Sequence, residues 1–360
     1  MSFPKAYIKL NNLRSNIKYL QSLSGDAKLY PVIKADAYGH GAVNIAHELA
    51  NLGIECVCVA TYCEIEDLVK NDIDIKILHL GRVFYEKFDI YFNQKVILTI
   101  NSIEDVQKIE CLIEKYNKPI KCYIKVDTGM NRMGCDIKDF DSIFEKVKNN
   151  SLFEIQGVYS HLSSSGNLLS DKNSLQFSRF IQKIDSLKDE KLKFHILNTG
   201  GLLNYSKYSL DIVRPGISIY GISPIKLNAR LKSVMEFKAP VVHIKKVSRG
   251  ESVGYDCKYV ANKDILIAIV QCGYADGMSK DFENKGVVFY KDYELEIVGK
   301  ISMDLFAIDC TGLELKINDE ITIWGGDNLN SKLENIAKKY NTIPYVYLTN
   351  LSKRVVREYV

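Results

Sequence analysis

Residues that can move protons or bind anions recur in this sequence directly after short apolar runs. Lys34 closes the apolar run of residues 29–33. The polar and glycine residues that follow later runs are Lys125, Asp127, Arg132, Ser160, His161, Asn198, Thr199, Gly200, Gly201, Arg214 and Gly216. Because the carboxyl ends of parallel strands meet at one edge of a sheet or barrel, this placement predicts a single site assembled from distant segments.

The chemistry that these residues suit is imine formation beside a bound phosphate. Partial burial lowers the pKa of a lysine, so a neutral amine at Lys34 can form a Schiff base with a carbonyl. The Thr199 hydroxyl and the backbone amides at Gly200 and Gly216 can bind a phosphate. A lysine beside a phosphate corner indicates pyridoxal phosphate. For each position taken alone, a solvated lysine and glycines that only form turns are the alternatives.

Short apolar runs alternate with amphipathic runs between residues 29 and 220, which predicts alternating strands and helices. The predicted strands are Leu29–Lys34, Cys56–Ala60, Lys76–Leu80, Val96–Thr99, Lys121–Val126, Ile155–Ser160, Lys193–Leu197 and Asp211–Val213. The predicted helices are Val43–Leu52, Glu64–Lys70, Ile103–Lys115 and Ser174–Leu187. Buried strands separated by helices form parallel sheets, and this series fits an N-terminal (β/α)8 TIM-type barrel over residues 1–225.

An open, doubly wound parallel sheet is the competing architecture. Its nucleotide-binding members have a Gly-x-Gly-x-x-Gly turn after the first strand. Here the first strand continues into residues 34–41, KADAYGHG, which do not match that fingerprint. The barrel is therefore favoured, and in a barrel the loops after the seventh and eighth strands are the usual phosphate site.

Residues 226–360 predict a second, mostly β domain, so the fold class is α/β with a β-rich C-terminal domain. The predicted strands are Val234–Val247, Ile265–Gln271, Gly286–Phe289, Glu294–Lys300, Leu305–Asp309 and Glu320–Trp324. Turn residues separate them, and residues 332–340 predict a helix.

Composition and charge exclude several classes of protein. The 360 residues include 48 basic and 44 acidic side chains, and the net charge of +4 argues against nucleic acid as a partner. No apolar run reaches the ~18 residues of a membrane span, and the N-terminus lacks the features of a secretion signal. The nine cysteines show no metal-ligand spacing. We therefore expect a cytoplasmic protein with reduced thiols, no metal site and no membrane partner.

Several longer runs resemble motifs of the alanine racemases. The longest, residues 32–42 (VIKADAYGHGA), is similar to the family's cofactor-lysine motif. The other similar runs are residues 125–134, 159–162, 198–200, 213–221, 253–255, 273–277, 298–304 and 351–355. The matches extend over nearly the whole chain. The resemblance implies a barrel followed by a β domain, pyridoxal phosphate as cofactor, and racemisation of alanine.

The resemblance also implies two bases on opposite faces of the substrate carbon. Lys34 would hold the cofactor and act as the base for the D-enantiomer, and Tyr255 would take the proton from the L-enantiomer. A free tyrosine has a pKa of about 10 and is a poor base at neutral pH, so His161 and Arg214 are implied as the neighbours that activate it. Arg214 is further implied to bond the pyridine nitrogen. Because arginine keeps its protons, that nitrogen stays unprotonated and transamination is suppressed.

The remaining roles are assigned by the same resemblance. Further cofactor contacts are implied for Tyr38, His161, Asn198, Thr199, Gly216, Ile217 and Tyr347. Substrate contacts are implied for Arg132, Met303, Asp304 and Tyr274, with Tyr345 beside the entrance. Lys125 matches a lysine that some members carbamylate to orient the arginine. In the family the tyrosine reaches the cofactor of the other subunit, which implies a homodimer with shared active sites and a role in supplying D-alanine for peptidoglycan.

Two departures from the family's pattern leave alternatives open. Ser302 stands where many members have cysteine, and Lys353 stands where some have a tyrosine near the phosphate. Lys353 keeps open a racemase of broader specificity that also performs β-elimination, a lyase activity. Basic amino-acid decarboxylases have a similar architecture, but Arg214 argues against them. Non-catalytic pyridoxal-phosphate carriers lack the β domain, so Tyr255 and Met303 argue against that class.

Overall fold

The computed structural model describes residues 3–187, 191–225, 230–283 and 286–360. The described residues pack into two compact units. The β-rich unit comprises Met1–Ser15, Tyr220–Ile222 and Leu231–Val360, and the barrel unit comprises Asn16–Ile219 and Ser223–Arg230. The start of the chain, predicted to belong to a first domain of residues 1–225, thus packs with the β-rich unit. The cause is strand β1 (Lys5–Ile8), which pairs with β11 (Met235–Val247) and β19 (Val356–Tyr359).

The barrel unit is a ring of parallel strands. Six of the described strands form one sheet in the order β3 (Cys56–Val59), β4 (Lys76–His79), β5 (Val96–Ile100), β6 (Ile120–Asp127), β8 (Phe153–Tyr159) and β9 (Lys193–His195). The short β7 (Cys135–Asp136) pairs with β6, and β2 (Lys28–Leu29) pairs with β10 (Ile212–Val213). With the two bridges described next, these pairings confirm the predicted (β/α)8 barrel.

Two isolated bridges close the ring. Val32 pairs with Cys58, which joins the segment after β2 to β3, and Asn198 pairs with Arg214, which joins the segments after β9 and β10. We call β2, β10 and these two bridges the seam of the barrel. The predicted first strand, Leu29–Lys34, was therefore too long as a continuous strand: β2 ends at Leu29 and Lys34 already lies in the next helical turn.

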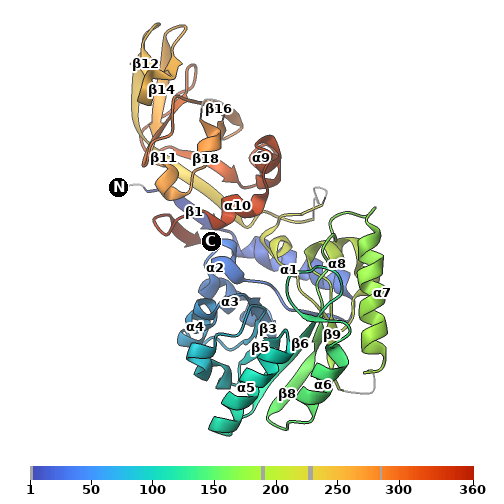
Figure 1. Ribbon diagram of the computed structural model, residues 1–360. Helices are drawn as coiled ribbons and strands as arrows, with labels where there is room; N and C mark the ends of the chain where they lie inside the picture. Colours follow the sequence, from blue (N-terminus) through green and yellow to red (C-terminus); the bar gives the residue numbers. More distant parts are fainter. Residues whose placement is uncertain (1–2, 188–190, 226–229, 284–285) are drawn as a thin grey trace. The chain divides into compact units, whose positions relative to one another are not determined.

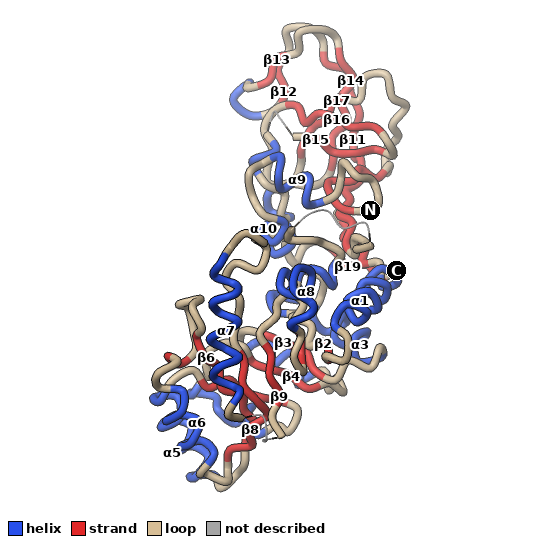
Figure 2. Tube along the Cα trace, turned by 90° about the vertical axis from the view of Figure 1, so that its right-hand side faces the viewer, coloured by secondary structure: helices blue, strands red, loops and turns tan. Residues whose placement is uncertain are grey.

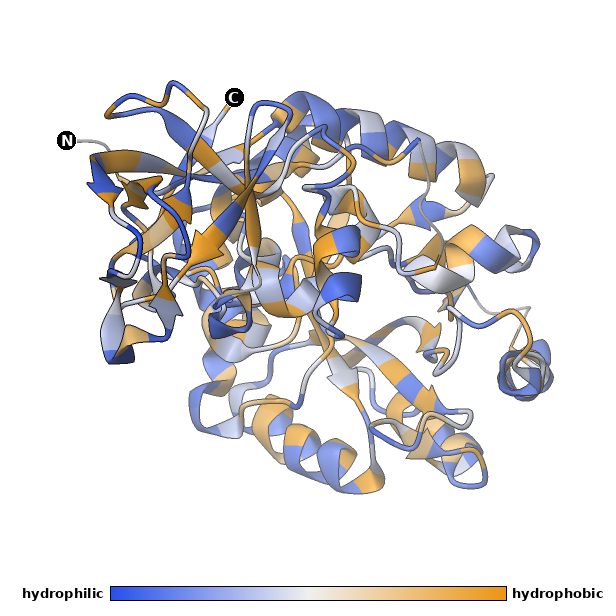
Figure 3. Cartoon of the chain, turned by 90° about the horizontal axis from the view of Figure 1, so that it is seen from above, coloured by the Kyte–Doolittle hydropathy of each residue, from blue (hydrophilic) through white to orange (hydrophobic). Residues whose placement is uncertain are grey.

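Helices cover the outside of the strands (Figures 1 and 2). The helices of this part of the chain are α1 (Leu10–Ser24), α3 (Ala42–Asn51), α4 (Tyr62–Lys70), α5 (Ile103–Tyr116), α6 (Phe140–Lys148), α7 (Asp171–Asp185) and α8 (Thr199–Tyr205), with 3₁₀ turns η1 (Tyr85–Phe92), η2 (Ser206–Tyr208) and η3 (Ile217–Tyr220). The short α2 (Lys34–Tyr38) is a turn that follows the segment after β2. The helices combine hydrophobic and hydrophilic residues (Figure 3), and in α5 the buried positions Val106, Ile109 and Ile113 recur three and four residues apart. Among the described residues, no helix has the length and hydropathy needed to cross a bilayer.

Aromatic side chains fill the barrel interior between the strands. The His195 imidazole stacks on the Tyr159 ring with centroids 4.8 Å apart and meets the Tyr123 ring edge-on at 4.9 Å. Both tyrosines are buried. The interior is a packed core, as in other barrels of this type, so binding is directed to the carboxyl ends of the strands.

The β-rich unit is built on one long sheet. Its order is β14 (Ile265–Val270), β17 (Phe306–Asp309), β16 (Tyr293–Val298), β15 (Val287–Tyr290), β18 (Glu320–Gly325), β11, β1 and β19. Strand β11 also pairs with β14, which curls the sheet back on itself. The other elements are the hairpin β12 (Ser252–Val253) and β13 (Tyr259–Val260), the helices α9 (Leu333–Lys339) and α10 (Pro344–Thr349), and the turns η4 (Tyr255–Cys257), η5 (Tyr274–Asp276) and η6 (Lys280–Phe282).

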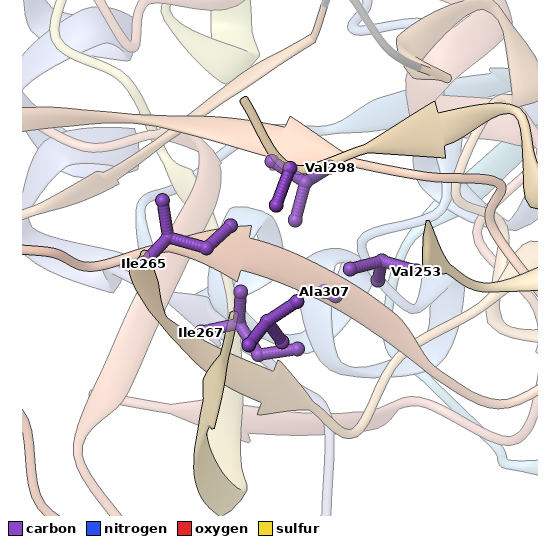
Figure 4. Close-up of a cluster of buried hydrophobic side chains, with 7 residues drawn as sticks. Val253, Ile265, Ile267, Val298 and Ala307 are labelled. Atoms are coloured by element: carbon purple, nitrogen blue, oxygen red, sulfur yellow. The ribbon is translucent and has the colours of Figure 1, made fainter. Parts of the chain in front are cut away.

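A hydrophobic cluster anchors the β12–β13 hairpin to this sheet. Figure 4 shows Val253 with Ile265, Ile267, Val298 and Ala307, side chains that come from the hairpin and from β14, β16 and β17. Tyr259 packs against the same cluster from the other strand of the hairpin. The hairpin tip that carries Tyr255 is therefore held on both sides.

Candidate active site

Four basic side chains and a histidine converge where the barrel strands end. The positive charge of Arg132 lowers the pKa of both Lys34 and Lys125. The charge of Arg214 lowers the pKa of Lys125 and of His161. The residues follow β2, β6, β8 and β10, as the sequence predicted. Such a concentration of positive charge, partly removed from water, is suited to binding anions.

Lys34 begins α2 and is half-buried. Burial lowers the pKa of its ammonium, the charge of Arg132 lowers that pKa further, and the carboxylate of Glu64 opposes both effects. The neutral amine is the nucleophilic form of lysine, so this environment favours imine formation.

The backbone that follows Lys34 forms a left-handed turn. Ala35, Asp36, Ala37 and Tyr38 all have φ of 52°. This conformation costs a non-glycine residue about 1–2 kcal/mol and persists only where the surroundings enforce it. The His40 Nδ1–H donates to the Ala37 carbonyl at 2.9 Å, and the Asp36 carboxylate accepts the Ala42 N–H at 2.8 Å.

Arg214 is fixed inside the barrel by interior groups. Its side chain is only 2% exposed. One terminal nitrogen donates to the Ser160 carbonyl at 2.6 Å, and the other donates to His195 Nδ1. The guanidinium also lies 4.9 Å from the centre of the Tyr159 ring. Because a guanidinium can only donate, His195 Nδ1 accepts and the proton of the neutral imidazole is on Nε2.

His161 is oriented by Asn198. The Asn198 Nδ2 lies 3.4 Å from His161 Nε2 and 3.3 Å from the Leu162 carbonyl oxygen. An amide N–H₂ group donates, so Nε2 accepts and the neutral imidazole carries its proton on Nδ1. Burial and the charge of Arg214 lower the pKa of His161 well below its usual value, which keeps the ring neutral.

Arg132 lies in a loop that Asp127 shapes. The Asp127 carboxylate accepts the backbone N–H groups of Gly129 and Met130 at 2.8 Å and that of Arg132 at 3.2 Å. These bonds fix where the Arg132 side chain starts, while the side chain itself is exposed.

Lys125 is 6% exposed, and its ammonium lies 5.7 Å from the centre of the Tyr159 ring. Burial lowers its pKa to about 8, and Arg214 and Arg132 contribute in the same direction. A substantial fraction of this amine is therefore neutral near physiological pH.

Replacing Lys125 with methionine tests this burial. Below pH 8 the lysine is charged in the folded and the unfolded chain, so the folded state bears the full cost of a buried charge. Between pH 8 and 10.5 the folded chain loses the proton first, the unfolded chain binds more protons, and wild-type stability rises with pH relative to the variant. We expect Lys125→Met to be more stable than wild type at pH 7 and this difference to shrink towards pH 10, in denaturant melts in CO₂-free buffer. A difference that stays constant with pH contradicts the lowered pKa.

A cluster of hydroxyl groups lies at the seam. The Gly216 N–H donates to Thr199 Oγ1 at 2.9 Å, and the Ser218 hydroxyl lies 3.3 Å from that oxygen. A Cβ at position 216 would lie 2.7 Å from the Tyr38 hydroxyl oxygen, so only glycine permits this approach. Ile217 is buried in η3 beside them.

These barrel residues fit pyridoxal phosphate. The hydroxyls of Tyr38 and Thr199 lie together at Gly216 and can donate to a phosphate, and the basic cluster matches its charge. Lys34 offers an amine for the aldehyde, and Arg214 offers a fixed donor.

Tyr255 lies at the tip of the β12–β13 hairpin in the β-rich unit. Its side chain is 68% exposed, and Asp256, the next residue, has φ of 57°. The Asp256 carboxylate is 2.5 Å from the Lys300 ammonium, which ties the tip to the segment after β16. The hairpin tip that carries the phenol is thus anchored, while the phenol itself is exposed.

The other predicted residues of the β-rich unit lie in adjoining segments. The Ser302 carbonyl accepts the Tyr274 N–H at 3.2 Å, and the Met303 carbonyl accepts the Ala275 N–H at 3.1 Å. The Asp304 carboxylate accepts a hydrogen bond from Arg354 at 2.7 Å. Tyr347 is buried in α10, and together with Tyr274 it lines a cavity of about 270 Å³.

Two residues of this site were missed by sequence reasoning. His195 fixes Arg214, but in the sequence it is one histidine within an apolar strand. Glu64 bonds the Ala35 N–H at 2.6 Å, but in the sequence it is an ordinary acid in the first turn of a helix. The signal available for His195 was its strand position, which places it on the barrel interior.

Comparison with known proteins gives concordant matches over the whole chain. Residues 8–224 match the family model described as "Alanine racemase, N-terminal domain", and residues 234–359 match "Alanine racemase, C-terminal domain". An alanine racemase of Halothermothrix orenii is 32% identical over 363 residues, covering 98% of this chain and 96% of that protein.

Solved structures agree with these matches. The alanine racemase of Clostridium difficile 630 superposes with a TM-score of 0.93 at 30% identity, covering 100% of this chain and 96% of that one. The alanine racemase of Bartonella henselae, solved with covalently bound pyridoxal phosphate, has a TM-score of 0.88 at 30% identity and complete coverage of both chains.

Proposed function

Because this chain belongs to the alanine racemase family, whose members are pyridoxal-phosphate-dependent isomerases, we propose that it interconverts L-alanine and D-alanine with two bases. The observation that carries the proposal is the convergence of a lysine of lowered pKa with a buried, interior-bonded arginine at the strand ends of the barrel.

Lys34 is assigned the covalent attachment of the cofactor and the proton transfer on the D-face. Bound pyridoxal phosphate supplies the electron withdrawal that acidifies the hydrogen on the substrate's α-carbon. The amine of Lys34 then accepts that proton at its Nζ, and its lowered pKa increases the share of the neutral amine. Tyr255 is assigned the same task at its phenolic oxygen on the L-face.

Arg214 is assigned to the pyridine nitrogen, as the family resemblance implies. Its bonds to the Ser160 carbonyl and to His195 hold the guanidinium still. Because arginine keeps its protons, it donates a hydrogen bond without protonating the nitrogen. His161 and Asn198 complete this wall of the site, and His161 stays neutral.

The phosphate of the cofactor and the carboxylate of the substrate are assigned to different sets of residues. We assign the cofactor's phosphate to Tyr38, Thr199, Gly216 and Ile217, and a further cofactor contact to Tyr347. The substrate carboxylate is assigned to Arg132 and the backbone of Met303, with Tyr274 at the entrance. The neutral fraction of Lys125 can react with CO₂, forming a carbamate and releasing a proton, which would place a negative charge beside Arg132.

We further propose that two chains share each active site in a homodimer. The exposed phenol of Tyr255 supports this, because a catalytic base must be shielded from water while it works. The large apolar side chains Val260, Met303 and Leu305 of the same unit are also exposed, and exposed apolar groups near a functional residue indicate a surface that is covered in an assembly. An isologous dimer is the commonest such assembly.

A substrate panel on the purified holoenzyme tests the function. We expect interconversion of the alanine enantiomers at least about tenfold more efficient, by kcat/KM, than that of serine, because one added polar group in a fitted pocket costs about 1–3 kcal/mol. Chiral chromatography follows racemisation, and pyruvate assays follow β-elimination. Equal efficiency with serine, or pyruvate as the main product, would instead support the broader racemase with lyase activity. No turnover of either alanine enantiomer would refute the proposal.

A further inference from the structure

We propose that Glu64 is a positioning residue for Lys34. Its carboxylate fastens the left-handed turn that carries the lysine, and it supplies the negative charge that faces the lysine ammonium. This inference deepens the proposed function, because it rests on Lys34 being the residue that holds the cofactor.

The carboxylate of Glu64 joins the ends of two barrel strands. Its Oε1 accepts the N–H of Ala35 at 2.6 Å, directly after Lys34. Its Oε2 accepts the N–H groups of Ala60 at 2.7 Å and Thr61 at 3.0 Å, directly after β3. One side chain therefore ties the segment after β2 to the segment after β3, beside the bridge of Val32 with Cys58.

This contact exceeds what the helix start requires. Thr61 and Glu64 form a capping box at the start of α4, in which one carboxylate oxygen bonds the Thr61 N–H. The second oxygen is not needed for that motif, yet it points to Ala35. The bond meets the turn at Ala35, its first left-handed residue, and so helps to hold a conformation that non-glycine residues adopt only when their surroundings enforce it.

The charge of Glu64 acts on Lys34 in the opposite direction to that of Arg132. The charged or titratable groups that act on the lysine come from the segments after three strands and from α4: Arg132, Lys125, His161 and Glu64. Among these described groups Glu64 alone is negative. Without Glu64, the negative charge that opposes burial and Arg132 would be lost, and the ammonium would hold its proton more weakly.

The first experiment measures the proton affinity of Lys34 directly. The full chain is freed of cofactor with hydroxylamine, and its lysines are labelled with trace acetic anhydride at a series of pH values. Mass spectrometry of the peptide that contains Lys34 then gives the pKa of its amine. We expect Glu64→Gln to lower that pKa by about one unit, the usual effect of removing an adjacent opposite charge.

Glu66→Gln is the matched control. Glu66 lies in the same helix and pairs with Lys70 at 3.1 Å, so its removal takes the same charge from α4 without touching the turn. The pKa of Lys34 should not change in this variant. An unchanged pKa in Glu64→Gln as well would overturn the electrostatic part of the proposal, and because labelling does not depend on turnover, this outcome differs from a failure of the racemase assignment.

The second experiment separates holding the turn from supplying the charge. Glycine adopts the left-handed conformation without strain, so Ala35→Gly removes part of the need for the bond. We expect Glu64→Gln to melt about 3 °C lower than wild type, and Glu64→Gln with Ala35→Gly to recover most of that loss while the pKa of Lys34 stays low. If Glu64→Gln alone folds poorly, the pKa of Lys34 is measured in the double variant instead. Failure of Ala35→Gly to restore the melting temperature would overturn the role in holding the turn.

Discussion

Replacing Lys34 with alanine is expected to abolish racemisation in both directions and to leave the protein unable to retain pyridoxal phosphate through denaturation. The variant lacks both the amine that bonds the cofactor and the base on one face of the substrate. Loss of a positioned base alone costs about 10²–10⁴ in rate, so kcat/KM should fall by at least about 10⁴ when the covalent attachment is lost too.

The measurement combines chiral chromatography of the product with mass spectrometry of the borohydride-treated protein. Lys121→Ala is the matched control, because Lys121 lies near the other end of β6 and donates to the Gln94 carbonyl at 2.9 Å, away from the strand ends that form the site. The fold should survive in Lys34→Ala, since the replaced side chain is a half-buried cation whose charged form is disfavoured. Reduction that still labels the chain at another lysine would refute the assignment.

Replacing Tyr255 with phenylalanine is expected to stop exchange at one face only. In D₂O the variant should still exchange the α-hydrogen of D-alanine through Lys34, whereas exchange from L-alanine should fall by about 10²–10⁴. Racemisation needs both faces and should fall by the same factor in both directions. Proton NMR of each enantiomer in D₂O measures the exchange. Tyr293→Phe, a change at another exposed tyrosine of the β-rich unit, should have no effect.

The same pair of variants tests whether the site is shared. Mixed dimers of Lys34→Ala and Tyr255→Phe chains contain one site that lacks both groups and one that is intact, provided that Tyr255 acts on the partner's cofactor. Random exchange of two equal populations makes half of the dimers mixed, so about a quarter of wild-type activity should return. If Tyr255 serves its own chain, no intact site forms and the mixture stays inactive.

Most of the barrel could be predicted because its pattern is local. Buried strands followed by amphipathic helices can be recognised from residue spacing, and the observed strands from β3 to β10, except the two-residue β7, fall at or near the predicted ranges. The pairing of β1 with β11 and β19 could not be predicted, because it joins residues more than two hundred positions apart and depends on tertiary packing.

The candidate site was predictable to the level of residue type and order but not of geometry. Lys34 and Arg214 could be identified from their motifs. The left-handed turn could not, because Ala35 and Ala37 favour right-handed helices and nothing in their local preference indicates φ of 52°. The contacts of Glu64 and His195 are equally invisible, since each acts on a residue distant in sequence.

The seam of the barrel has a consequence for how the protein resists unfolding. The ring is completed there by single bridges rather than by full ladders, and one of those bridges joins Asn198 to Arg214, beside the hydroxyls of Thr199 and Tyr38. If the phosphate of the cofactor binds at this corner, as proposed, it contacts segments on both sides of the seam and holds them together. Cofactor binding and resistance to unfolding are therefore linked, and protease resistance should rise with the concentration of pyridoxal phosphate.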